Sequence, residues 1–336
     1  ATLAGVYSRF KSSSFAGGNI AIINDNRGDD YVNTGNNTYA HSDTYNMTVG
    51  QNSIMNPGFV QAGYLAINAA NTLKENLEKR DHLPISEAKR QQYIASCLFI
   101  RDISWYYLSQ VYSQPYAYDP NSKAIPVHTE AVIGPGQNDT RLWTISEIYD
   151  QIITDLSSNV IAALPAGGVS GFDPTIPTQP AAHMLLQRIY MAKQEWQKAI
   201  DEGEQVTGFT LSGSVREMFD APYHTAENIY SLPFTNTERG GGNPASYISS
   251  AVGYIDTLNV RTGIVTIPAY HLATDSRTSF IKVDPVTGRE TWYEKYDEYN
   301  TPLEWIHIFR YAETLLNLSE SYYNLGNYAK AAQLLH

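Results

Sequence analysis

The sequence predicts a mainly α-helical protein, in which helical hairpins of the tetratricopeptide type stack as an α-α superhelix and support a loop-rich lobe with a few short strands. Three observations lead to this prediction. Apolar residues recur with helical spacing in five stretches, and two of these stretches share one pattern although they lie far apart in the chain. Other segments are rich in Gly, Pro, Ser, Thr and Asn, which interrupt regular structure.

The first two predicted helices are long. One covers about residues 57–80, and its apolar stripe is Leu65, Ala69, Leu73 and Leu77. The other begins at Ser86, although Lys89 lacks the acidic group that would complete a capping box there. This helix ends before Pro115, and its stripe is Ile94, Cys97, Leu98, Arg101, Trp105, Leu108 and Tyr112.

Three more helices are predicted further along the chain. One begins at Thr144, because Glu147 three residues later completes a capping box, and Pro165 stops it. Its apolar face is Ile148, Ile152, Leu156 and Ile161. The fourth follows Thr178, with Pro180 in the first turn, where its missing N–H costs little. The fifth covers about residue 303 to the end.

Two of the helical stretches have matching sequences. Tyr190–Ala199 can be aligned with Tyr322–Ala331: an aromatic residue closes one helix, a short polar turn follows, an aromatic residue opens the next helix, and an alanine comes three residues on. The small alanine lets two antiparallel helices approach closely. This pattern is typical of a helix–turn–helix unit of the tetratricopeptide type, which must stack on its neighbours to bury its apolar face.

The remaining segments are predicted to form the loop-rich lobe, at about residues 12–56 and 208–302. The helical scaffold then covers about residues 57–207 and 303–336. Within the second lobe segment, residues 280–293 predict a β-hairpin with Asp284 to Gly288 as its turn. Asp25 to Asp30 superficially matches a calcium loop, but its glycine is misplaced and the distal glutamate is missing. We interpret that stretch as a polar turn.

Composition and motifs exclude several functions. The chain has 34 acidic and 23 basic residues and a net charge of −11, which disfavours binding of nucleic acid. Its single cysteine, Cys97, permits no internal disulfide and is expected to be a buried, inert thiol. No zinc, phosphate-loop or nucleophile-elbow motif occurs. We therefore predict no catalytic residue, no metal and no cofactor.

Tyrosine is unusually frequent, with 25 Tyr beside 5 Trp and 10 Phe. A core does not require so many hydroxyl-bearing rings, so we expect some of them on a surface. Two clusters mix aromatic rings with amides and charged groups, as a sugar needs for stacking and for its hydroxyls. For each tyrosine, the alternative is that it packs a loop onto the helices. The predicted glycan-binding residues are Tyr39, Tyr45, Asn46, Trp292, Tyr293, Tyr296 and Tyr299.

Six short motifs occur in a characteristic order. They are Arg101–Tyr112 with Pro115 and Ala124–Val127, Thr144–Leu156 with Leu164–Pro165, Ala181–Ala199, Glu227–Tyr230, Asp275–Arg277, and Arg310-Tyr-Ala-Glu313 through Gly326 to Ala331. In this order they resemble the SusD/RagB family, the outer-membrane glycan-binding lipoproteins of Bacteroidetes. The family's ligand-contacting aromatic residues lie in variable loops, so the resemblance points to the two lobe segments without transferring individual residues.

The resemblance implies a single SusD-like domain over residues 1–336. It also implies a lipid-anchored protein on the extracellular face of the outer membrane. Such a protein captures oligosaccharide or polysaccharide and delivers it to a SusC-like TonB-dependent transporter for nutrient uptake, without a reaction or a cofactor. The chain lacks the family's lipoprotein cysteine and stops at His336 within a helix, so we expect a trimmed or partial chain.

Two other functions remain open on the sequence. A tetratricopeptide-type scaffold that binds a protein or peptide would use the helical stack and leave the tyrosines as packing residues. An α-helical glycoside hydrolase would need two carboxylates facing each other across a cleft. Any of the 34 acidic residues could supply them, but no local motif selects a pair, so we predict that the protein is not an enzyme.

Overall fold

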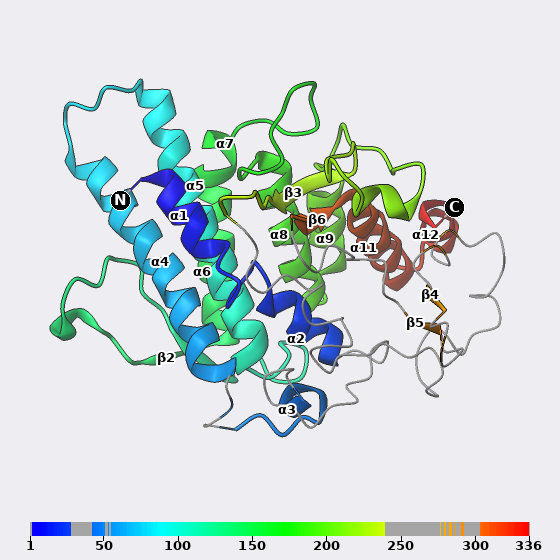
Figure 1. Cartoon of the computed structure of the whole chain (residues 1–336), viewed down its shortest axis with the longest axis horizontal. Helices are drawn as coiled ribbons and strands as arrows, with labels where there is room; N and C mark the ends of the chain where they lie inside the picture. The colour runs from blue at the N-terminus through cyan, green and yellow to red at the C-terminus, as the bar shows by residue number, and fades with distance from the viewer. Residues whose placement is uncertain are drawn as a thin grey trace.

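The computed structural model describes residues 2–27, 42–50, 53, 55–238, 276, 279, 282–283, 286, 290–291 and 303–335. Most of these residues lie in helices, which confirms the predicted fold class (Figure 1). The helices are α1 (Leu3–Phe10), α2 (Asn19–Arg27), α3 (Ser42–Tyr45), α4 (Met55–Lys79), α5 (Glu87–Tyr112), α6 (Ile145–Asp155), α7 (Ile161–Ala163), α8 (Gln179–Ala192), α9 (Trp196–Gly203), α11 (Tyr311–Asn324) and α12 (Tyr328–Leu334).

Short helical turns and strands complete the described fold. The turns are η2 (Pro135–Gln137), the π-helical η3 (Leu156–Val160) and η4 (Val215–Met218). The strands form three antiparallel pairs: β1 (Lys123–Pro126) with β2 (Leu142–Thr144), β3 (Asn228–Leu232) with β6 (Ile306–Arg310), and β4 (Lys282–Val283) with β5 (Glu290–Thr291). The pair β4–β5 confirms the strands of the hairpin predicted at residues 280–293.

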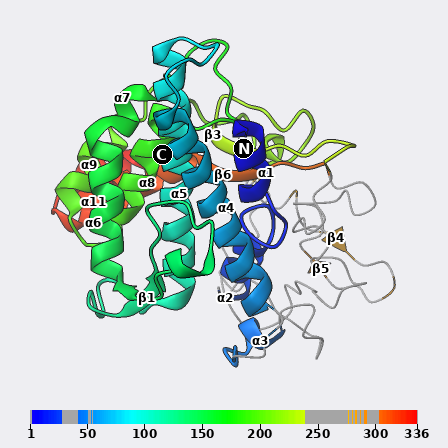
Figure 2. The same cartoon turned by 90° about the vertical axis from the view of Figure 1, so that its left-hand side faces the viewer.

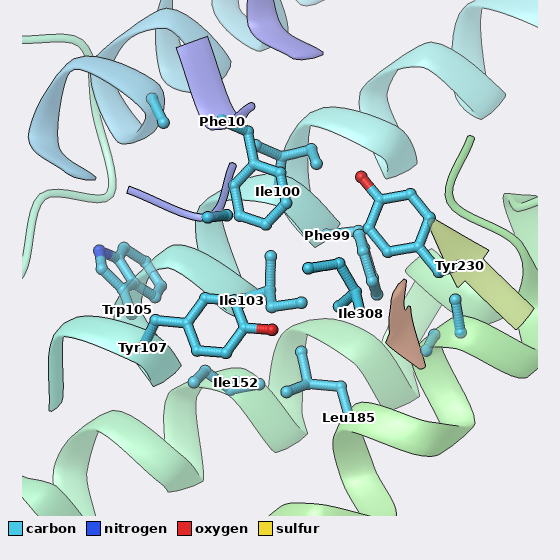
Figure 3. Packing of buried hydrophobic residues seen from close by; sticks show 14 of the residues in the cluster. Phe10, Phe99, Ile100, Ile103, Trp105, Tyr107, Ile152, Leu185, Tyr230 and Ile308 are labelled. Atoms are coloured by element: carbon cyan, nitrogen blue, oxygen red, sulfur yellow. The ribbon is translucent and has the colours of Figure 1, made fainter. Parts of the chain in front are cut away.

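The longest helices, α4 and α5, pack side by side, and α1 contacts both. Figure 2 shows α1 on one side of α4, and α6, α9 and α11 on the other. Phe10 from α1, Ile100 and Ile103 from α5, Leu185 from α8 and Tyr230 from β3 converge in one apolar core (Figure 3). Since these side chains come from elements that are distant in the sequence, a single core joins the helical stack to the N-terminal segment.

The caps predicted for α5 and α6 are present. The Ser86 hydroxyl accepts a hydrogen bond from the Lys89 amide at 3.3 Å. At α6, the Glu147 amide donates to the Thr144 hydroxyl, and the Thr144 amide donates to the Glu147 carboxylate at 2.7 Å. These reciprocal bonds satisfy amides that a helix leaves unpaired at its start. The apolar stripe after α6 then continues through the π-helical turn η3 into α7.

The two matching stretches form matching hairpins, α8–α9 and α11–α12, and α9 packs against α11. The alanines Ala199 and Ala331 are both buried. The two turns also close in the same way: the Glu195 amide donates to the Tyr190 carbonyl and the Asn327 amide to the Tyr322 carbonyl, both at 2.9 Å. These are the long bonds of a helix C-terminal motif that requires a left-handed residue. The left-handed residues here are Gln194 (φ 59°) and Gly326 (φ 80°).

Three expectations are wrong. Residues 306–310, expected in the last helix, form β6, because they pair with β3. Asp25, which was assigned to a polar turn, lies in α2, one of two short helices within the segment 12–56. α2 forms because its Ile20, Ile22 and Ile23 are buried. Leu65 is 42% exposed, and the buried face of α4 instead includes Ala62, Ala66, Ala70, Leu73 and Leu77.

Candidate functional site

Two of the seven predicted glycan-binding residues lie in described parts of the structure. Tyr45 ends α3 and is half-buried, and Asn46 follows it and is exposed. Tyr39, Trp292, Tyr293, Tyr296 and Tyr299 lie outside the described residues. That these two residues and the other five form one binding surface stays a prediction.

A cavity of about 340 Å³ lies where α2, α5, α8 and β6 meet. Its lining mixes aromatic rings with polar groups, although none of its residues was among the predicted contacts. The residues around it are Ala16, Ile20, Ala21, Asn24, Tyr106, Tyr107, Gln110, Val111, Arg188, Phe219, Ile306, His307, Ile308 and Arg310. Its volume falls at the small end of the range for ligand sites, roughly 300–1,000 Å³.

The α5 wall of the cavity is held by stacked tyrosines. The Tyr106 ring stacks on that of Tyr149 in α6 with centroids 6.1 Å apart, and Tyr149 stacks on Tyr116 at 5.7 Å. The Gln110 side-chain amide donates a hydrogen bond to the Tyr149 hydroxyl. α6 thus fixes both Tyr106 and Gln110, two of the groups that line the cavity. Because this support comes from packed rings, the wall is formed before any ligand arrives.

The tyrosine hydroxyls on this wall stay protonated at neutral pH. Burial raises the pKa of Tyr106 to about 12, and burial also raises the pKa of Tyr107 above its ordinary value. A neutral phenol can both donate and accept a hydrogen bond. The wall therefore offers a ring face and hydroxyl groups, without a negative charge.

Arg188 of α8 is anchored by Glu313 of α11. Its Nε and Nη2 donate to the two Glu313 carboxylate oxygens at 2.5 and 2.6 Å, and Nη2 also donates to the Ile308 carbonyl at 2.9 Å. The guanidinium lies 4.4 Å from the centre of the Phe309 ring. Burial opposes the charge, but Glu313 outweighs it and raises the pKa of Arg188. This two-point pair joins the two helical hairpins at the cavity.

His307 of β6 closes another side of the cavity. Its Nε2 lies 2.6 Å from the Met218 carbonyl, which can only accept, so Nε2 carries the proton. Its Nδ1 then accepts from the Asn228 amide at 3.0 Å or the Ser231 hydroxyl at 2.9 Å. These contacts fix the orientation of the imidazole against the Phe219 ring, whose centroid lies 5.7 Å away.

A second, more open groove of about 410 Å³ lies between α4 and the segment that joins β1 to β2. Leu65 lines it, together with Tyr64 and His128, whose rings lie 5.5 Å apart. The Tyr64 hydroxyl donates to the Pro126 carbonyl at 2.7 Å, and Asn68 bonds both backbone groups of Val132. Tyr64 and Asn68 are thus engaged within the protein, whereas Asn24 and Arg310 of the first cavity are polar groups at its edge that a ligand can reach.

The described part of the chain contains neither a metal-binding cluster nor a membrane-spanning helix. No cluster of three or more His, Cys, Asp or Glu side chains there could hold a metal ion. No described helix is long and apolar enough to span a membrane.

Sequence patterns alone did not identify the cavity, although some of its residues lie in the recognised motifs. Tyr106 and Gln110 belong to the α5 motif, and Arg310 begins the α11 motif. These motifs were interpreted as markers of the fold. One usable signal was Arg188, a charged residue inside the apolar run of α8, since a buried charge requires a partner.

The comparisons with known proteins agree with this fold. Residues 12–191 match a family, SusD-like_3, that is described as starch-binding and associating with the outer membrane. A SusD superfamily protein from Bacteroides fragilis is 35% identical, with a TM-score of 0.90 over 99% of this chain and 76% of that one. No curated protein matches the sequence.

Two more distant structures share the fold. A protein from Bacteroides vulgatus, described as sugar-binding, has a TM-score of 0.82 at 22% identity, over 99% of this chain and 75% of that one. A surface glycan-binding protein from Bacteroides uniformis has a TM-score of 0.75 at 17% identity, over 99% of this chain and 78% of that one.

Proposed function

Because the chain belongs to the SusD superfamily, in a family described as starch-binding and associating with the outer membrane, we propose that it binds glycan at the cell surface. In this proposal a lipid anchor holds it on the extracellular face of the outer membrane. There it delivers oligosaccharide or polysaccharide to a SusC-like TonB-dependent transporter for nutrient uptake. Two neighbours of similar fold, one described as sugar-binding and one as a surface glycan-binding protein, support the glycan-binding part of this proposal.

The observation that supports glycan binding most directly is the composition of the cavity between α2, α5, α8 and β6. A sugar ring has C–H faces, which pack on aromatic rings, and hydroxyl edges, which need donors and acceptors. Tyr106 and Phe219 supply rings, and Asn24, Gln110 and Arg310 supply polar groups. Tyr39, Tyr45, Asn46, Trp292, Tyr293, Tyr296 and Tyr299 remain the proposed contacts of the loop-rich lobe.

Binding is tested with the purified protein and a panel of polysaccharides, by affinity electrophoresis and then by calorimetry. We expect Gln110→Ala and Asn24→Ala to weaken binding through the cavity, and Tyr45→Ala and Trp292→Ala to weaken it through the loop-rich lobe. Tyr118→Ala is the matched control, because Tyr118 is 81% exposed and lies outside the cavity. The loss of one stacking or hydrogen-bonding contact should cost about 1 kcal/mol, which is roughly a fivefold loss of affinity.

Delivery to a transporter needs a separate experiment. Full-length protein from the native outer membrane should co-purify with a TonB-dependent transporter, and deletion of its gene should slow uptake of the glycan that it binds. If the protein binds none of the polysaccharides and binds a peptide instead, the proposal is wrong. That result would favour the alternative of a tetratricopeptide-type scaffold.

A further inference from the structure

Arg310 lies at the edge of the cavity, between a strand and a helix. It is the last residue of β6 and the residue that precedes α11. Its guanidinium carbon lies 6.0 Å from the centre of the Phe219 ring, and both residues line the cavity. The Arg310 side chain keeps 35% of its surface exposed. A ligand that entered the cavity would therefore meet a cation beside an aromatic ring.

The charges around the cavity are unusual for this protein. The whole chain has a net charge of −11, yet the lining of the cavity includes two arginines and, among the described residues, no aspartate or glutamate. Arg188 is already satisfied by the two oxygens of Glu313 and the Ile308 carbonyl. Both nitrogens of His307 are also engaged, by the Ser231 hydroxyl and the Met218 carbonyl. Among the described lining residues, Arg310 is thus the arginine whose donors a ligand can use.

Arg310 is only weakly engaged within the described part of the protein. Its Nη1 lies 3.7 Å from the Glu227 carboxylate, which is longer than a hydrogen bond. Glu227 is almost fully buried, and its other oxygen accepts from the Ser212 amide at 3.1 Å. A guanidinium has five N–H donors in a planar fork that matches a carboxylate. Most of these donors remain available to a ligand.

We infer that this cavity selects a sugar that bears a carboxylate, such as a uronic acid residue of the glycan. The Arg310 guanidinium takes the carboxylate, and the Phe219 ring packs against the C–H face of the same sugar. This inference rests on the proposed glycan binding and adds the chemical class of the sugar. A charge-assisted hydrogen bond contributes roughly 1.5–3 kcal/mol, so the acidic sugar should bind about tenfold more tightly or better than its neutral counterpart.

The test compares pairs of glycans that differ only in the carboxylate. Polygalacturonate, alginate and glucuronoxylan are each measured against their carboxyl-reduced forms by calorimetry with the full chain, with starch as a neutral reference. We expect at least one acidic form to bind about tenfold more tightly at low salt. Its advantage should shrink as salt is added, because salt screens an exposed ion pair.

Variants of Arg310 separate its charge from its geometry. Arg310→Gln should remove the preference, so that the acidic glycan and its carboxyl-reduced form bind with similar affinity. Arg310→Lys should retain part of the preference, because lysine offers a charge without the fork. Arg141→Gln is the control, since Arg141 lies outside the cavity and stacks on Trp143. Thermal unfolding checks that each variant is folded.

The possible results are distinct. If each reduced form binds as tightly as its acidic parent, or if folded Arg310→Gln keeps the acidic preference, the inference is wrong while glycan binding stands. If the protein binds none of these glycans in either form, starch included, both the inference and the proposed function fail.

Discussion

The pair between Arg188 and Glu313 should contribute strongly to stability, and Glu313→Gln tests it. In the native protein two guanidinium N–H groups donate to the two carboxylate oxygens at 2.5 and 2.6 Å. Glutamine keeps one acceptor oxygen but places an NH₂ group where the second acceptor stood. The substitution therefore brings the glutamine NH₂ group against an N–H group of Arg188, and it leaves the Arg188 charge without a counter-charge.

The size of the effect follows from the exposure of the pair. Removing one member of a buried ion pair costs roughly 3–5 kcal/mol. The Arg188 and Glu313 side chains are 20% and 28% exposed, so water partly screens the charge that is left. Arg188 also keeps its bond to the Ile308 carbonyl. We therefore expect the lower end of the range, about 3 kcal/mol, and a melting temperature lower by about 5 °C or more.

Thermal and denaturant unfolding of the full chain measure this loss. Glu78→Gln is the control, because its i,i+4 pair with Lys74 is more exposed and should contribute less than about 1 kcal/mol. In the double variant Arg188→Met, Glu313→Leu, no charge is left unpaired, so most of the lost stability should return. If Glu313→Gln destabilises the protein no more than Glu78→Gln does, the pair is not a stabilising contact between the hairpins.

Three further predictions concern the hairpin turns and the buried titratable groups. Gln194→Gly should raise the free energy of unfolding by about 0.5–1 kcal/mol in denaturant titrations, because it relieves a left-handed residue. Gly326→Ala at the matching turn should lower it, and equal shifts of the same sign would contradict this explanation. Burial raises the pKa of Tyr106 and Tyr112 to about 12. The stability that their neutral hydroxyls contribute should therefore be complete below pH 10 and lost as the pH rises from about 10 to 12. Tyr106→Phe and Tyr112→Phe should make this decline in the free energy of unfolding smaller. Burial also raises the pKa of Cys97 to about 12, so a thiol reagent at neutral pH should label Cys97 only after unfolding. Rapid labelling of Cys97 in the folded protein would contradict this prediction.

Local signals predicted much of the scaffold. The capping box at Thr144 and Glu147 placed the start of α6, and the alignment of Tyr190–Ala199 with Tyr322–Ala331 predicted two hairpins with the same turn. These features depend on residues within a few positions of one another. A helix cap or a helix–turn–helix unit is specified by its own sequence, so the chain need not be folded for it to be recognised.

The errors arose where distant parts of the chain meet. Residues 306–310 form β6 because they pair with β3, more than 70 residues earlier, which overrides the helical pattern that continues after Arg310. In α4, Leu65 was assigned to the same stripe as Leu73, but it is exposed and lines the groove beside the segment that joins β1 to β2. Periodicity shows that a helix has an apolar face, whereas the packing partner decides which residues of that face are buried.

The sequence by itself determined the helical class, the repeated hairpins and the family of this protein, because each depends on local patterns or on motifs in linear order. It also drew attention to a lobe rich in tyrosine, where Tyr45 and Asn46 remain candidate contacts. Only the tertiary structure placed Tyr106, Phe219 and Arg310 around one cavity. Those residues come from α5, the segment after η4 and the end of β6. These residues are close because distant elements pack together, and the spacing of residues along the chain does not predict that packing.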